Sequence, residues 1–198
     1  MGNYIGTSDL REYLGVGSTT GDTLLGYAVS AAEAKIDSRC HRSFVGSTGT
    51  RYYRADDLLN GEFRGGTGTV LWLRKDLLTL GGLTNGDETT IASTDCWLEP
   101  RNSPPYQYIR LKTAEAWSFG TDGEIAVAGT WGYSTVAPND IVDATKQLAA
   151  YYWRLKDSQV FDVVASPESG TITIPKGVPA SVDKILRDGG YIKKLGIY

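Results

Sequence analysis

Apolar side chains recur at helical spacing toward both ends of the chain, whereas the middle alternates in short runs typical of strands. Residues 22–39 give the firmest helix, because apolar positions follow at steps of three and four and Asp22 stands where an N-cap is expected. A shorter helix is predicted to begin among residues 7–9 and to end at Gly15. The stripe predicted for the longer helix consists of Leu25, Ala28, Val29, Ala32 and Ile36.

The last third of the chain predicts two more helices separated by an extended stretch. Pro138 and Asp140 announce a helix that continues to about residue 156. A final helix begins near Pro179 and breaks at Gly189. Between these helices, residues 157–178 combine Val, Ile and Thr runs with Pro and Gly, a composition that favours extended chain.

The middle of the chain predicts about six short strands joined by turns. Residues 46–49 and the glycine-rich residues 65–68 indicate turns, and Asn85-Gly86 is a hairpin signal. Residues 77–83 form a further apolar run that ends in two glycines. The predicted strands are residues 51–54, 70–73, 89–91, 96–98, 106–111 and 124–131.

These elements together predict an α+β fold: a small helical bundle of about four helices from both chain ends, with an inserted antiparallel β-sheet or small barrel. A chain of 198 residues can bury roughly 70% of its unfolded surface, so one domain with an insertion is expected. We divide it into an N-terminal helical part, residues 1–50, a β-rich insertion, residues 51–134, and a C-terminal helical part, residues 135–198. The last part includes the extended loop 157–178 and a tail.

Composition narrows the classes of function. A hydrophobic content of 41% and a charged content of 22% are typical of a folded globular protein. The formal net charge is −3 and Lys and Arg are scattered along the chain, which argues against a dedicated DNA-binding protein. The first residues lack a signal-peptide pattern and no run approaches 18 apolar residues, so we expect a soluble cytosolic product without membrane contact.

Residue types that carry chemistry are sparse. Cys40 and Cys96 belong to no CxxC pair and are expected to be free, buried thiols. His41 is the only histidine, and its place directly after Cys40 suits helix capping better than a Cys–His dyad. The stretch 65–69 lacks the Lys-Ser/Thr ending of a phosphate loop. We therefore expect no catalytic residue, cofactor or metal, and no enzyme.

Acidic pairs leave one alternative open. Carboxylates in turns are usually solvated, but pairs of them beside aromatic side chains can hold a cation or cleave a glycosidic bond. A carbohydrate-binding module or glycosidase therefore remains a minor hypothesis. The residues concerned are Asp56, Asp57, Asp87, Glu88, Asp122 and Glu124, with Trp97 or Trp117 as the aromatic neighbour.

The order of three motifs resembles the head–tail connector proteins of tailed bacteriophages, also called neck adaptors or head-completion proteins. The first is the helix that runs from Asp22-x-Leu24-Leu25 to Arg42-x-Phe44. The second is Val127-x-Gly129-Thr130-Trp131-Gly132-Tyr133 followed by Val136-x-Pro138-x-Asp140-Ile141-x-x-Ala144 and Leu148-Ala149-Ala150-Tyr151-Tyr152. The third is Pro175-x-Gly177-Val178-Pro179-x-x-Val182-x-x-Ile185-Leu186. The resemblance covers the two ends of the chain, and residues 52–121 depart from the smallest members.

This resemblance implies a structural virion protein located in the neck, between capsid and tail, and made in the host cytoplasm. Such proteins form a ring, here expected to contain about twelve copies, beneath the portal protein. The ring extends the channel for DNA packaging and ejection and offers a docking surface to a tail or stopper protein. Double-stranded DNA passes through without specific binding. Another neck or tail-completion protein, such as a stopper or tail terminator, is the alternative.

The resemblance also suggests where protein contacts lie. Residues 157–178 are a candidate for strand addition or for threading between neighbouring subunits, through Val160, Phe161, Val163, Ile172 and Ile174. The tail combines apolar anchors with two lysines and is a candidate for docking on the portal. Its residues are Tyr191, Ile192, Lys193, Lys194, Leu195 and Tyr198. The alternative is a tail that folds back on its own subunit.

Overall fold

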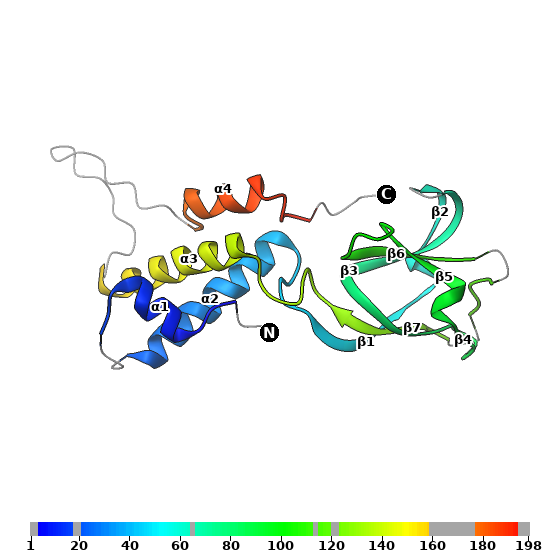
Figure 1. Cartoon of the computed structure of the whole chain (residues 1–198), viewed down its shortest axis with the longest axis horizontal. Coiled ribbons are helices and arrows are strands. Elements are labelled where there is room, and N and C mark those ends of the chain that lie inside the picture. Colours follow the sequence, from blue (N-terminus) through cyan, green and yellow to red (C-terminus); the bar gives the residue numbers. More distant parts are fainter. Residues whose placement is uncertain are drawn as a thin grey trace. The chain divides into compact units, whose positions relative to one another are not determined.

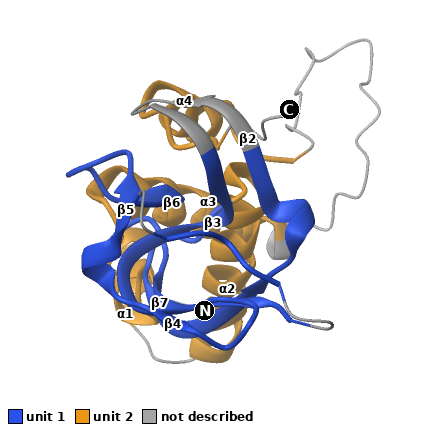
Figure 2. Ribbon diagram, turned by 90° about the vertical axis from the view of Figure 1, so that its right-hand side faces the viewer, with its two compact units in different colours: residues 1–2, 42–136 blue, residues 3–41, 137–198 orange. Residues whose placement is uncertain are grey.

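A computed structural model describes residues 4–17, 21–63, 66–112, 115–119, 123–158 and 177–193. The chain divides into two compact units (Figure 2). The sheet unit comprises residues 1–2 and 42–136, and the helical unit comprises residues 3–41 and 137–198. The helical unit is therefore built from both ends of the chain.

The helical unit contains four helices in its described part: α1 (Thr7–Leu14), α2 (Asp22–Cys40), α3 (Asn139–Ser158) and α4 (Ala180–Asp188). Helix α3 packs against each of the other three, as the α1, α2 and α4 ribbons around it illustrate (Figure 1). The core positions of the helical unit are almost fully shielded from solvent, so burial of apolar surface is the main stabilising contribution. They include Leu10, Leu25, Ile36, Ile141, Leu148 and Leu186.

The predicted stripe of α2 is confirmed, since all five of its residues are buried. The N-caps of α1 and α2 lie just before the residues predicted from the sequence. Gly21, with φ 97°, is the N-cap of α2, and Asp22 is the first helical residue and pairs with Arg11. Gly6 is the N-cap of α1, and its N–H donates to the Asp9 carboxylate at 2.7 Å. The acidic side chains still serve the helix N-termini, but from inside the first turn.

The described part of the sheet unit contains seven strands in one antiparallel sheet. They are β1 (Ser47–Tyr53), β2 (Leu58–Phe63), β3 (Gly66–Thr84), β4 (Thr90–Ile91), β5 (Cys96–Glu99), β6 (Tyr106–Leu111) and β7 (Ile125–Trp131). The order is β1-β7-β3-β6-β5, while β2 and β4 each pair with β3. The α+β prediction is confirmed, and the sheet does not close into the barrel that was its alternative.

Strand β3 differs most from the sequence prediction. We expected two separate apolar runs, at 70–73 and 77–83, and a glycine-rich turn at 65–68. The structure has one strand from Gly66 to Thr84, which pairs with β2, β4, β6 and β7 and changes register at two places. Strand β2 was not predicted, and β1 begins at Ser47, inside the expected turn 46–49. Pairing with neighbouring strands overrides the local turn composition in these segments.

One face of the sheet carries the core of this unit. Alternate residues of β7 are buried from Ile125 to Trp131, the period of two expected of a strand with one covered face. The buried side chains of this core include Leu71, Leu73, Leu77, Leu83, Ile109, Ile125 and Val127. Across all the residues that the structure describes, no helix has the length and apolar content needed to cross a bilayer.

Candidate functional site

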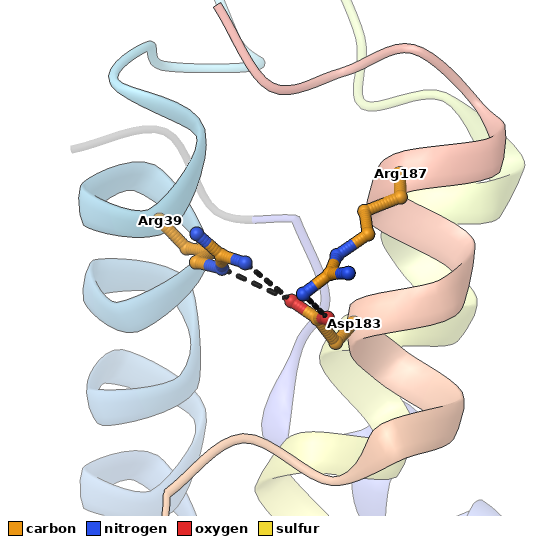
Figure 3. A network of polar contacts seen from close by, with 3 residues as sticks. All are labelled: Arg39, Asp183 and Arg187. Carbon is orange, nitrogen blue, oxygen red and sulfur yellow. Dashed lines mark hydrogen bonds and ion pairs between the residues drawn. The ribbon is translucent and has the colours of Figure 1, made fainter.

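A three-residue network ties α4 to α2 in the helical unit (Figure 3). The Asp183 carboxylate on α4 accepts hydrogen bonds from Nε and Nη2 of Arg39 on α2, at 3.0 and 2.8 Å. Arg187, one turn further along α4, pairs with the same carboxylate at 2.6 Å. One carboxylate shared by two guanidinium groups fixes the position of α4 along α2.

The described start of the tail folds back on its own subunit. Tyr191 is buried, and its hydroxyl donates to the Asp140 carboxylate of α3 at 3.1 Å. Lys193 is also buried, and its backbone N–H donates to the carbonyl of Cys40 at 3.0 Å. Ile192 between them is partly exposed. These contacts match the alternative in which the tail packs on its own subunit, and portal docking stays a prediction for the residues beyond.

The other predicted contact residues lie outside the described residues. They are Val160, Phe161, Val163, Ile172 and Ile174 of the 157–178 segment and Lys194, Leu195 and Tyr198 of the tail. Within that segment, Asp157 and Ser158 belong to the end of α3. The structure therefore brings together only the first three of the predicted tail residues.

A buried carboxyl group connects the first described residues to α2. Glu33 accepts a hydrogen bond from the backbone N–H of Tyr4 at 2.7 Å, and the Tyr4 hydroxyl bonds to Asp37 one turn later. Burial raises the pKa of the Glu33 carboxyl, although the backbone N–H groups of Tyr4 and Ile5 partly offset that rise. Glu33 therefore holds the residues before α1 on α2, although its carboxyl group loses hydration.

The acidic pairs considered for sugar chemistry serve local structure. Asp57 is buried and pairs with Arg74 at 2.6 Å. Glu124 pairs with Arg54 at 2.8 Å. Asp87 accepts the backbone N–H of Thr89, and hydrogen bonds to Thr89 lower the pKa of its carboxyl. Asp122 lies outside the described residues. The geometry thus gives Asp57, Asp87 and Glu124 local structural partners.

The cysteines and the histidine occupy the positions expected of them. Cys40 and Cys96 are buried and form no disulfide in the part of the chain that the structure describes, as predicted, and burial raises the pKa of the Cys96 thiol. His41 is the C-cap of α2 with φ 56°, and its N–H bonds to the carbonyl of Asp37. Within the described ranges, no three His, Cys, Asp or Glu side chains form a group suited to a metal ion.

A cluster of cations around Trp97 was not found from the sequence. The guanidinium carbons of Arg101 and Arg110 each lie 4.1 Å from the centroid of the indole ring, and Nζ of Lys112 lies 5.9 Å from it. Trp97 on β5 is directly opposite Arg110 on β6, and the cluster thus depends on the register of these two strands. We call these four residues the Trp97 cluster.

Comparison with solved structures finds this fold in particle necks. The chain matches one of the structure "Neck of empty GTA particle computed with C6 symmetry" with a TM-score of 0.60 and 22% identity, covering 92% of this chain and 89% of that chain. It matches one of "Neck of native GTA particle computed with C12 symmetry" with a TM-score of 0.56 and 20% identity, covering 90% and 86% of the two chains.

A third match is to the virion of a native gene transfer agent (GTA) particle, with a TM-score of 0.54 and 20% identity, covering 91% of this chain and 88% of that chain. No protein-family model and no curated protein matches the sequence. At this level of identity the comparison shows a shared fold, and the shared fold extends over both units.

Proposed function

We propose that this protein is a structural component of the neck of a phage-like particle. The observation that carries the proposal is the fold match over about nine-tenths of this chain to chains of gene transfer agent necks. The sequence motifs at both ends of the chain support the same conclusion independently of the β-rich middle.

Within the neck, we place the protein as the head–tail adaptor beneath the portal. The C12 symmetry of one matching neck supports a ring of twelve copies. A ring of identical subunits needs two different faces on each subunit that meet and close by rotation. In this proposal double-stranded DNA passes through the ring without sequence-specific binding, and the far side of the ring receives a tail or stopper protein.

In this proposal the two predicted contact segments bind different partners. The loop predicted at 157–178 adds to or threads between neighbouring subunits, and the tail docks on the portal. The contact residues beyond the described ones are Val160, Phe161, Val163, Ile172 and Ile174 in the loop and Lys194, Leu195 and Tyr198 in the tail. Tyr191 and Lys193 hold the start of the tail on α3 and α2.

Electron microscopy of the protein mixed with the portal of the same genome tests the proposal. We expect an added coaxial ring of twelve copies on the portal. Added density at a lower level, bound only when another neck protein is present, would indicate a stopper or tail-completion protein. No added density in either mixture would contradict a neck role.

A truncation and a control substitution test the tail. Removing residues 194–198 leaves Tyr191 and Lys193 in place and is expected to abolish portal binding while the thermal melting temperature is unchanged. The control exchanges Lys184 for Gln, which removes an exposed charge from α4. Portal binding that survives the truncation would overturn the docking role of the tail.

A further inference from the structure

The Trp97 cluster concentrates positive charge on one face of the sheet. Trp97 and Arg110 are cross-strand partners, and Lys112 follows Arg110 by two positions, so all three belong to the same face. The core residues Leu98 and Ile109 alternate with them and belong to the opposite face. The cations therefore lie on the face of β5 and β6 that is turned away from the core.

The charge of this cluster is only partly compensated. Arg101 pairs with Glu99 at 3.2 Å, and its side chain remains 49% exposed. Lys112 donates to the backbone carbonyl of Thr94, and Nε of Arg110 is buried without a hydrogen-bond partner. Among the described residues, no carboxylate forms an ion pair with Arg110 or Lys112. Of the three cations around the ring, only Arg101 therefore has an ion-pair partner among the described residues.

The guanidinium groups of Arg101 and Arg110 lie over the indole ring and can still bind an anion through N–H donors other than the buried Nε of Arg110. A guanidinium group that stacks on an aromatic ring keeps its N–H donors in its own plane, free to bind oxygen atoms at its edge. A single carboxylate carries one negative charge, whereas duplex DNA carries a row of phosphates with one negative charge about every 1.7 Å along its axis. A phosphate backbone can therefore engage several cations of the cluster together.

We propose that the Trp97 cluster is a sequence-independent contact for the phosphate backbone of double-stranded DNA. The presence of DNA at this surface rests on the proposed neck function. A weak contact of this kind does not require a basic protein, so it is compatible with the net charge of −3. Three cations per subunit are fewer than the roughly six to ten phosphate contacts of a strong DNA binder. Each subunit would hold DNA weakly, and a ring would repeat the contact around the duplex.

Titration of the free, isotope-labelled protein with a short duplex tests the contact without requiring ring formation. In about 20 mM salt, we expect resonance shifts centred on the Trp97 indole N–H and the backbone amides of Arg101 and Lys112, and their loss at about 200 mM salt. The double variant Arg101→Gln/Lys112→Gln should weaken binding by about tenfold or more and lower the slope of log K against log salt by about 2.

Arg51→Gln is the matched control, because Arg51 also stacks on an indole, 4.9 Å from the ring of Trp131, but does so alone. It should bind DNA like the unchanged protein. The proposal is overturned if the duplex causes no shift at the cluster, if Arg51→Gln weakens binding as much as the double variant, or if polyglutamate shifts these resonances and the duplex does not. The last result would assign the cluster to an acidic protein segment.

The titration and the microscopy test the DNA contact and the neck role independently. DNA shifts at Trp97 with no added density in either microscopy mixture would keep the contact and remove the neck role. A twelve-fold ring with no DNA shifts would keep the neck role and remove the contact.

Discussion

Arg42 and Asp76 form an ion pair inside the sheet unit, with Nε and Oδ2 3.3 Å apart and side-chain exposures of only 9% and 2%. The Arg42 guanidinium also lies 5.1 Å from the centre of the Tyr133 ring. The backbone carbonyl of Asp76 accepts the N–H of Gly132 at 2.9 Å. The pair thus joins the start of the unit, the middle of β3 and the segment after β7.

Breaking this pair on one side should cost far more than removing it whole. Arg42→Met leaves a buried carboxylate without its cation, and we expect a loss of about 3–5 kcal/mol in the free energy of unfolding. The double variant Arg42→Met/Asp76→Leu should recover most of that loss, because no charge is left buried. Urea denaturation of both variants measures the difference. Similar losses in the two variants would contradict this account.

Gly129 and Gly49 form a matched pair for testing backbone approach, since they are opposite one another on β7 and β1. A Cβ on Gly129 would lie 2.3 Å from the carbonyl oxygen of Thr79, whereas a Cβ on Gly49 would meet nothing within 4 Å. We expect Gly129→Ala to lose about 2–4 kcal/mol and Gly49→Ala to stay within about 0.5 kcal/mol of the unchanged protein. Thermal melting of the two variants compares them, and equal effects would refute the close approach.

The contacts of Asp183 with Arg39 and Arg187 should stabilise α4 measurably. The exposed pair between Lys184 and Asp188 should not. Asp183→Asn weakens contacts to both Arg39 and Arg187, and we expect a loss of about 1 kcal/mol that shrinks as salt rises. Asp188→Asn, which removes an exposed pair with Lys184, is the control and should change little. Hydrogen exchange of the α4 amides reports the difference. Unchanged α4 protection in Asp183→Asn would show that the network contributes nothing.

Glu33 predicts a pH dependence of stability. Its folded-state pKa is raised, chiefly by desolvation, so the protonated form favours folding. This contribution is fully present below the unfolded pKa and is lost as the pH rises through the folded pKa. Glu33→Gln keeps an oxygen acceptor for the N–H of Tyr4, and it should therefore be more stable than the unchanged protein at neutral pH but not near pH 4. Denaturation curves at both pH values measure this, and a constant difference between the proteins would contradict it.

Helices were predictable because their signals are local. The α2 stripe, the glycine that ends α1 and the proline before α4 each act within a turn or two of the chain. Strand β3 was not predictable to the same degree, because Arg74, Lys75 and Asp76 interrupt its apolar run. Its continuity follows from pairing with β6 and β7, which come later in the sequence.

The candidate site depended even more on distant parts of the chain. Arg110 and Lys112 are distant from Trp97 in the sequence, and the antiparallel register of β5 and β6 places Arg110 opposite that residue. The Arg42–Asp76 pair was missed for the same reason. The tail was noticed from its mix of apolar and basic residues, but the packing of Tyr191 against Asp140 needs the position of α3.

The division of the helical unit between the two chain ends has a consequence for biosynthesis. Helix α2 leaves the ribosome before α3 exists, and residues 42–136 must be translated in between. At typical translation rates this interval lasts about 5–20 s, during which the apolar stripe of α2 has no partner from α3. The sheet unit is nearly continuous in sequence and can fold during that wait. The nascent chain should therefore present its first helices to chaperones, and subunits should become competent for assembly only after α3 has been made.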